Sequence, residues 1–389
     1  MALSLGWGRD TNSLRESVPQ MARSGYGPAS QMGRAAMDIR PRGPVYNHGY
    51  TPNTCEETAG PPRRGTIVGG RRVSGVQGEG DRMTGMTGYA RAAAPAISLR
   101  GVVKRFGAIT AVNGLDLEVR AGVCFGLLGP NGAGKSTTMR MLTAQTLADE
   151  GAIAVLGYEL PRESKQSRLE MGVVPQLDNL DVELTCRQIL TVFARLYRVP
   201  RAERAAAVHR ALEVANLVPR ADTIVKELSG GMRRRLLVAR GLIHEPRLVL
   251  LDEPTVGLDP QVRQELWSLI DGLRASGVTV LMSTHYIEEA ERLADTVAVM
   301  SGGRIIAQGT PAELVGAHAG EQVLEVYGPP DRLAEVSELA AENGWSSRRS
   351  GPAVAIMRAE TLDGAAPEGV RRPANLEDAF VALTGEEIE

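Results

Sequence analysis

Several features are scarce or missing in this chain of 389 residues. Its three cysteines, Cys55, Cys124 and Cys186, lack the spacing of a metal or redox motif, and their odd number argues against a disulfide framework. No apolar run approaches the roughly 18 residues that a membrane-spanning helix needs. The N-terminus lacks the basic segment and apolar core of a secretory signal. We therefore expect reduced thiols in a cytosolic protein, with any link to a membrane made through a partner.

The chain also lacks a strong charge of either sign. Its 44 Lys and Arg residues and 46 Asp and Glu residues give a net charge of −2. A nucleic-acid-binding domain usually carries a basic excess, so no nucleic-acid partner is expected. The hydrophobic share of 43% and the charged share of 23% fit a soluble globular protein. The length allows two modest domains or one large domain with extensions.

Residues 1–94 contain no lysine and no sustained hydrophobic period, and they are rich in Gly, Pro, Ser and Arg. This composition predicts a disordered tail. A basic arm for anionic lipid or nucleic acid is the alternative interpretation. We also hypothesise that native translation begins at Met83 or Met86. N-terminal mass spectrometry tests this hypothesis, and peptides from residues 1–80 would contradict it.

From residue 96 onward the hydrophobic pattern predicts strands. Residues 97–103 and 115–119 alternate between apolar and polar side chains, which is typical of half-buried strands. The continuous apolar run 123–128 favours a strand buried on both faces. A helix is expected to follow it from Lys135.

Residues 185–238 are predicted to be mostly helical. Thr185 and Gln188 fit a capping box, in which each side chain satisfies a free backbone N–H group. The helical period then places four side chains on one face: Ile189, Phe193, Leu196 and Tyr197.

Strand patterns return at 248–251 and 278–282, with a helix between them. Asp259 suits the N-cap of that helix and Pro260 its first position, while Gly277 suits its end. Strands that alternate with helices predict an α/β fold, in which helices cover both faces of a mainly parallel sheet. The long helical segment is then an inserted subdomain.

After about residue 316 the pattern changes. Residues 323–327 and 353–357 have the character of strands, and residues 331–342 that of a helix. These elements predict a small α+β appendage at the end of the chain.

A glycine-rich segment follows the apolar run 123–128 and opens the next predicted helix. It has the spacing of a phosphate-binding P-loop, whose glycines let backbone N–H groups converge on phosphate oxygens at a helix N-terminus. Lys135 is expected to reach the β and γ phosphates, and the Ser136 hydroxyl to ligate Mg²⁺. The expected nucleotide-binding residues here are Gly129, Pro130, Asn131, Gly132, Ala133, Gly134, Lys135, Ser136 and Thr137.

Two carboxylates end the strand 248–251. Asp252 is positioned to hold Mg²⁺ beside the P-loop, directly or through water. Glu253 then has no metal to neutralise it, and we interpret it as the base that orients and polarises the attacking water. A structural cap or ion pair is the alternative role for Glu253.

The segment Leu228-Ser-Gly-Gly231, shortly before these carboxylates, completes a set of short motifs. Together they resemble the ATP-binding cassette (ABC) superfamily, the nucleotide-binding subunits of ABC transporters, over residues 96 to about 315. The resemblance implies a P-loop ATPase fold of the ABC type, with ATP and Mg²⁺ bound. Together with the changes of composition and pattern at its two ends, it predicts a tail 1–94, an ATP-binding domain 96–316 with a helical subdomain at about 177–238, and an accessory domain 317–389.

The resemblance also implies roles for single residues. Phe106 would stack on the adenine ring. Gln176 would contact Mg²⁺ and the water, and would sense the membrane partner.

Further roles concern a second subunit. Ser229, Gly230 and Gly231 would bind the γ-phosphate of ATP held by the opposite subunit, and Asp259 would lie at the dimer interface. His285 would contact the γ-phosphate as a third catalytic residue beside Glu253 and Gln176. One chain carries one P-loop and one signature, so a complete site needs a head-to-tail pair.

Met232 stands where many family members have Gln, and Gly-Met there is similar to exporters of the ABC-2 type. Three further segments share that similarity, 125–130, 174–180 and 285–292, and residues 375–380 followed by 383–385 resemble the tail of these exporters. Nodulation-factor export ATPases are the most similar type, and daunorubicin-resistance ATPases are related. The three arginines Arg233, Arg234 and Arg235 are interpreted as a solvated or docking face.

This branch implies an ABC-2 type permease as partner and a peripheral position at the cytoplasmic face of the membrane. The cargo would be a drug, an antibiotic, a lipid or a lipo-oligosaccharide. A soluble ABC ATPase outside transport is the alternative function, and a non-hydrolysing regulatory module is a third. Soluble ABC ATPases usually have two cassettes in one chain or a long coiled-coil insertion, and neither is visible in this sequence. The intact set of catalytic residues argues against the regulatory module.

Overall fold

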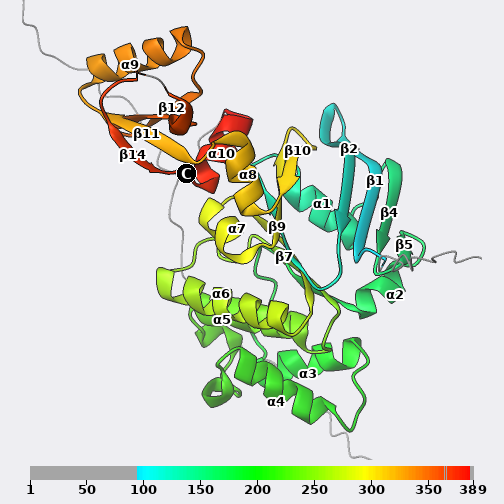
Figure 1. Ribbon diagram of the computed structural model, residues 1–389. Helices are drawn as coiled ribbons and strands as arrows, with labels where there is room; N and C mark the ends of the chain where they lie inside the picture. The colour runs from blue at the N-terminus through cyan, green and yellow to red at the C-terminus, as the bar shows by residue number, and fades with distance from the viewer. Residues whose placement is uncertain (1–93, 363, 365, 386–389) are drawn as a thin grey trace, which may run out of the picture. The chain divides into compact units, whose positions relative to one another are not determined.

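The computed structural model describes residues 94–362, 364 and 366–385 (Figure 1). Apart from residue 94, the predicted tail 1–94 and the hypothetical start at Met83 or Met86 lie outside the described residues. Within them, no helix has both the length and the apolar character needed to cross a membrane.

A six-stranded sheet forms the centre of the ATP-binding part. Its strand order is β10-β9-β3-β8-β7-β6, and all neighbours are parallel except β10 and β9. The predicted mainly parallel sheet is therefore confirmed. The strands are β3 (Cys124–Leu128), β6 (Met171–Val174), β7 (Leu248–Asp252), β8 (Thr279–Thr284), β9 (Thr296–Ser301) and β10 (Arg304–Gly309).

Successive residues of the central strands enter two different cores, because side chains alternate across a sheet. Leu251 and Met282 pack with helices on one face, and Leu250 and Leu281 pack on the other. Every residue of β3 and β8 is buried. The continuous apolar run in the sequence is explained by this burial on both faces.

A second, antiparallel sheet covers one of those cores, together with α1 (Lys135–Leu142). The alternation at 97–103 and 115–119 correctly predicted strands but did not reveal that they form a separate sheet. Its order is β2-β1-β4-β5, with β1 (Ile97–Phe106), β2 (Ile109–Val119), β4 (Glu150–Val155) and β5 (Tyr158–Leu160).

The predicted helical segment is confirmed between β6 and β7, where Figure 1 draws it in green. The Thr185–Gln188 capping box is present at the start of α3. The segment contains α3 (Cys186–Leu196), α4 (Arg204–Val214), the short turns η1 (Val218–Arg220) and η2 (Val225–Glu227), and α5 (Gly230–Leu242). A further helix, α2 (Ser164–Leu169), precedes β6.

The predicted burial of one side chain on the α3 face was wrong. Leu196 is 64% exposed, whereas Leu190 is fully buried. The buried face of α3 is rotated about the helix axis relative to the predicted face, toward the side that carries Leu190. This rotation leaves Leu196 at the edge of the buried stripe. The residues on this stripe are Ile189, Leu190, Phe193, Ala194 and Tyr197.

Helices α6 (Pro260–Ala275) and α7 (Ile287–Leu293) follow β7 and β8. The predicted N-cap is confirmed, because the Asp259 side chain accepts a hydrogen bond from the Val262 N–H at 2.9 Å. Gly277 follows the helix end with φ of +80°, a backbone conformation that suits glycine.

The predicted strands and helix after residue 316 are also confirmed. They belong to a third sheet of order β12-β13-β11-β14, which is antiparallel throughout. Its elements are β11 (Gln322–Tyr327), α9 (Pro330–Glu342), β12 (Ser347–Ser350), β13 (Ala353–Ile356), η3 (Ala359–Thr361) and β14 (Val370–Pro373).

Two helices flank this third sheet in the chain, α8 (Pro311–His318) before it and α10 (Leu376–Thr384) after it. Leu376 and Phe380 of α10 share a core with Leu314 of α8 and Leu293 of α7. The other side of α10 holds Asp378, which is fully buried against two arginines. Helix α10 therefore contacts both the third sheet and the ATP-binding part.

Candidate functional site

Four loops meet at one edge of the six-stranded sheet, because the strands that precede them are neighbours and run in parallel. The P-loop follows β3, His285 follows β8, Asp252 ends β7, and Gln176 follows β6 shortly after its end. The strand register aligns these ends, with Leu128 opposite Thr284, Ser283 opposite Asp252, and Leu251 opposite Val174. Ligands of open α/β sheets bind at such carboxyl ends.

The P-loop takes a backbone course that needs its glycines. Gly134 has φ of +105°, and a Cβ there would lie 2.4 Å from the Ala111 carbonyl oxygen. A Cβ on Gly129 would lie 2.2 Å from the Met300 carbonyl oxygen. The loop therefore passes directly over the neighbouring backbone, and it leads into the N-terminus of α1 at Lys135. A helix N-terminus of this kind favours a phosphate group.

The Lys135 ammonium is almost fully buried within this loop, at 4% exposure. Its Nζ donates hydrogen bonds to the carbonyl oxygens of Gly129 at 2.7 Å and Pro130 at 3.0 Å. The Glu253 carboxylate lies 3.6 Å away. Burial lowers the pKa of Lys135, and the attraction of Glu253 opposes that effect.

One carboxylate oxygen of Asp252 accepts hydrogen bonds from two hydroxyl groups. Ser136 Oγ lies 3.2 Å from Asp252 Oδ1, and Ser283 Oγ lies 2.6 Å from it. The first pair joins the P-loop to the end of β7 across 116 residues. Ser283 Oγ also accepts a hydrogen bond from the backbone N–H of Glu253, at 3.1 Å. This hydroxyl therefore holds both acidic residues, although the sequence interpretation missed it. A polar residue near the end of an otherwise apolar strand was the available signal.

Glu253 lies at the centre of the cluster. Its Oε2 accepts a hydrogen bond from Gln176 Nε2 at 2.8 Å, and its Oε1 faces Lys135 and lies 3.5 Å from His285 Nδ1. The backbone of Glu253 has φ of +45°, in the left-handed region that residues with a Cβ rarely adopt. Strain of this kind is concentrated at functional sites.

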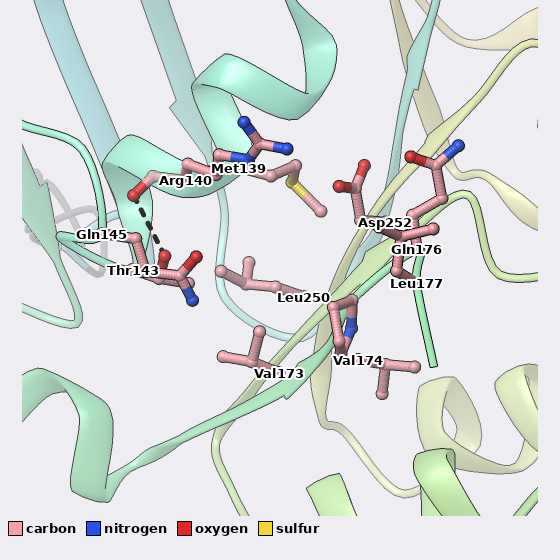
Figure 2. Close-up of a pocket in the computed structure, with 11 residues that line it drawn as sticks. Met139, Arg140, Thr143, Gln145, Val173, Val174, Gln176, Leu177, Leu250 and Asp252 are labelled. Atoms are coloured by element: carbon pink, nitrogen blue, oxygen red, sulfur yellow. Dashed lines mark hydrogen bonds between the residues drawn. The ribbon is translucent and has the colours of Figure 1, made fainter. Parts of the chain in front are cut away.

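A pocket opens beside this cluster, between the end of β6 and the C-terminal half of α1. Figure 2 shows Gln176 and Asp252 next to each other on one wall, and Arg140, Thr143 and Gln145 on the opposite wall. Leu177 lines the pocket as well and is 76% exposed. The other lining residues are Met139, Val173, Val174, Pro175 and Leu250.

The remaining predicted site residues lie outside the cluster. Phe106 ends β1 and is 49% exposed, with Lys104 Nζ 5.2 Å from the centre of its ring. Ser229 N-caps α5 through the Met232 N–H, and Asp259 N-caps α6. Both capping residues are exposed, as are the residues that follow them, Gly230 and Pro260.

The three arginines after the signature do not form one solvated face, so that interpretation was wrong for Arg234. Arg234 is 9% exposed and donates hydrogen bonds to five backbone carbonyls beside the cluster. Arg233 and Arg235 instead pair with the carboxylates of Asp178 and Glu265. Successive helix positions differ by 100° in direction, so three adjacent arginines cannot share one surface.

A P-loop, a Ser136–Asp252 pair and a glutamate at the end of a parallel strand define a P-loop nucleotide triphosphatase, and the signature helix places it among ABC ATPases. A family model described as ABC transporter matches residues 112–256. The chain is 47% identical over 306 residues to Nod factor export ATP-binding protein I of Ralstonia nicotianae, covering 76% of this chain and 95% of that protein. It is 45% identical to the protein of the same name from Rhizobium meliloti, covering 76% and 89%.

The chain belongs to the ABC transporter family. It is an ATP-binding subunit of an ABC exporter, with the activity of an ABC transporter ATPase.

Solved structures agree with this fold. A structure titled as the ATP-binding subunit of an ABC transporter superposes with a TM-score of 0.54 at 28% identity, covering 58% of this chain and 94% of that one. The dimeric structure of MJ0796, a bacterial ABC transporter cassette, gives 0.51 at 26% identity, covering 55% and 98%.

Proposed function

We propose that two copies of this chain hydrolyse ATP at their shared interface and thereby drive export through a separate membrane subunit. One observation carries the proposal: a single chain holds the two halves of an ABC site apart. Among the described residues, no hydrogen bond or ion pair joins the signature segment 229–231 to the cluster around Glu253. A second chain is needed to bring a signature to the P-loop.

The exposed start of α5 suits that encounter. Ser229, Gly230 and Gly231 present a helix N-terminus, whose partial positive charge attracts a phosphate group. In a head-to-tail pair each signature meets the γ-phosphate held by the other subunit, and the exposed Asp259 lies at the same interface. The dimeric structure of MJ0796 supports this arrangement.

The residues of the P-loop fit ATP with Mg²⁺. The loop amides and Lys135 hold the β and γ phosphates, and Phe106 stacks on the adenine ring. Ser136 and Asp252, whose oxygens lie 3.2 Å apart, supply with Gln176 the oxygen donors that Mg²⁺ prefers. Bound Mg²⁺ neutralises charge on the phosphates and orients them.

Hydrolysis then uses the groups around Glu253. The oxygen of a water molecule forms a bond to the γ-phosphorus while the bond to the β–γ bridging oxygen breaks, and ADP leaves. Glu253 orients the water and accepts its proton, while Gln176 fixes the other carboxylate oxygen. His285 contacts the γ-phosphate. ATP favours the closed pair and hydrolysis releases it.

A membrane partner is best accommodated at the pocket beside Gln176. Leu177 exposes an apolar side chain there, next to the residue that contacts Glu253. We propose that a cytoplasmic segment of an ABC-2 type permease docks in this pocket and holds the chain at the cytoplasmic face of the membrane. The similarity to Nod factor export proteins favours a lipo-oligosaccharide as the cargo, among the drug, antibiotic and lipid classes. The residues from 317 onward then form an accessory domain.

Co-expression of the full chain with an ABC-2 type permease from the same genome tests the proposal. We expect the two to co-purify in detergent, and we expect ATP to drive uptake of a lipo-oligosaccharide into inverted vesicles. Vesicles that carry the permease alone are the control. An active ATPase that binds no membrane protein would instead support a soluble ABC ATPase outside transport.

A further inference from the structure

Arg234 makes more hydrogen bonds to backbone carbonyls than the cluster's own side chains do. It donates to Pro254 at 2.7 Å through Nε, and to Pro175 at 2.7 Å and Gln176 at 3.2 Å through Nη1. Its Nη2 reaches the carbonyls of Glu253 at 3.1 Å and Asp252 at 3.4 Å. One guanidinium thus joins the loop after β6 to the loop after β7.

These carbonyls belong to the two segments that position the hydrolytic groups. Gln176 and Glu253 contact each other through their side chains at 2.8 Å, and Arg234 holds the backbone of both. A planar guanidinium with five N–H donors suits several fixed carbonyls, whereas a lysine ammonium does not. Burial lowers the pKa of Arg234 to about 10, so the group remains charged at neutral pH.

Arg234 also lies on the signature helix, five residues after Ser229. Two further arginines of α5 contact the same loop after β6: Arg233 pairs with Asp178 at 3.4 Å, and Arg240 donates to Asn179 at 2.8 Å. Helix α5 is therefore fixed to this loop over two turns, with Arg234 as the group that also reaches the end of β7.

We propose that Arg234 is a positioning residue that couples the two nucleotide sites of the pair. The inference rests on the proposed function, in which Ser229 acts on ATP in one site while Gln176 and Glu253 act on ATP in the other. Because Arg234 joins these groups within one chain, closure of α5 on the partner's nucleotide also sets the geometry of Gln176 and Glu253.

Replacement of the guanidinium by an ammonium tests the coupling. In full-length Arg234→Lys we expect ATP affinity to stay within about twofold of wild type, because Arg234 does not touch the P-loop residues. We expect kcat to fall about tenfold or more, since small errors in the placement of reacting groups are costly. We expect the Hill coefficient for ATP to lie between 1 and 2 in the wild type, because the pair has two sites, and to equal 1 in Arg234→Lys.

Arg348→Lys is the matched control. Arg348 is equally buried, at 9% exposure, but it lies in β12 and pairs with Glu377 and Asp378. It should lower thermal stability without changing kcat or the Hill coefficient. Three results would each overturn the inference. The first is that Arg234→Lys keeps the wild-type kcat and cooperativity, and the second is that both variants lose kcat and cooperativity equally. The third is a Hill coefficient of 1 in the wild type.

A measurement without the Arg234 variant covers the case in which that variant does not fold. The hydrogen-exchange rates of backbone amides in full-length Glu253→Gln are measured at increasing ATP concentrations. The amides of Gln176 and Leu177 and those at 229–232 should gain protection with the same midpoint, and separate midpoints would overturn the coupling. Rapid ATP hydrolysis by Glu253→Gln would instead contradict the proposed function itself, so the two failures are distinguishable.

Discussion

Gln176 Nε2 donates a hydrogen bond to Glu253 Oε2 at 2.8 Å, although the two residues are 77 positions apart in the chain. The contact leaves only Oε1 of Glu253 to face Lys135 and His285. One oxygen is therefore held by the loop after β6, which also borders the pocket proposed for the permease. Any displacement of that loop changes the position of the glutamate.

Loss of this contact should slow hydrolysis without weakening ATP binding. In Gln176→Leu we expect kcat to fall about tenfold or more, while KM for ATP stays nearly constant, because Gln176 contacts neither Lys135 nor the P-loop amides. Steady-state hydrolysis by the purified full chain measures both constants. Gln308→Leu, an exposed change on β10, is the control. An increase in KM with an unchanged kcat would contradict the role of Gln176 beside Glu253 and leave it only the role of a Mg²⁺ donor.

Glu253→Gln should retain ATP binding and lose turnover by about 100-fold or more, because the amide cannot accept the proton of the attacking water. The pair should then persist in the presence of ATP, which size-exclusion chromatography with and without nucleotide detects. Normal turnover in this variant would show that another group acts as the base.

Lys135→Ala should weaken nucleotide binding itself. The buried ammonium lies within the loop that is expected to hold the phosphates, and loss of a charged contact of this kind costs about 3 kcal/mol, or about 100-fold in Kd. Titration calorimetry with ATP measures the change. Arg140→Ala, on the exposed side of the same helix, should bind ATP normally. Equal affinities for ATP in all three proteins would exclude Lys135 from phosphate binding.

Acid should destabilise the fold through His244. Burial lowers the pKa of His244 to about 4 from its ordinary 6.5, so the folded state binds fewer protons than the unfolded state between these values. The stabilisation is complete above pH 6.5 and is lost as the pH falls toward 4, by roughly 3 kcal/mol in total.

His244→Phe isolates this effect, because a phenyl ring can keep the stack on Tyr197, whose ring centre is 3.8 Å away. Urea unfolding at several pH values should show wild type losing stability relative to His244→Phe below pH 6.5. His209→Gln, at an exposed position, serves as the comparison. A constant difference between wild type and His244→Phe from pH 7 to 4.5 would contradict the prediction.

Removal of the buried carboxylate of α10 should destabilise the C-terminal part of the chain. Asp378 accepts hydrogen bonds from Arg348 at 3.0 Å and from Arg372 at 2.6 Å. Asp378→Ala leaves both guanidinium groups without this partner and should cost about 3–5 kcal/mol. Glu377→Ala, which removes a half-exposed partner of Arg348, should cost less than about 1 kcal/mol. Thermal unfolding of both variants measures the difference, and similar losses would contradict the special role of Asp378.

Local features of the site were predictable from the sequence because they depend on short spacings. The P-loop glycines, the Asp259 N-cap and the Thr185–Gln188 capping box each involve a few consecutive residues. The ends of the parallel strands were predictable for a similar reason, since a polar residue after a buried run marks the edge of the sheet.

Contacts between distant segments were not predictable in the same way. The bond between Gln176 and Glu253 depends on the adjacency of β6 and β7, and that adjacency is a property of the whole sheet. Arg234 was assigned wrongly because its neighbours are arginines, and composition cannot reveal which of three adjacent side chains faces the interior. Ser283 was missed because a hydroxyl in an apolar strand has no characteristic spacing.

The contact between α8 and α10 has a consequence for how this chain can be redesigned. The third sheet leaves the ATP-binding part through one helix and returns through the other, and both helices share a core with α7. Its entry and exit points are therefore neighbours, so the sheet is an insertion that a short linker between the two helices can replace. Asp378 would lose both of its arginines in such a deletion. Because Asp378 lies on the other side of α10 from the core shared with α7 and α8, its carboxylate would then face solvent, and a shortened protein can keep it.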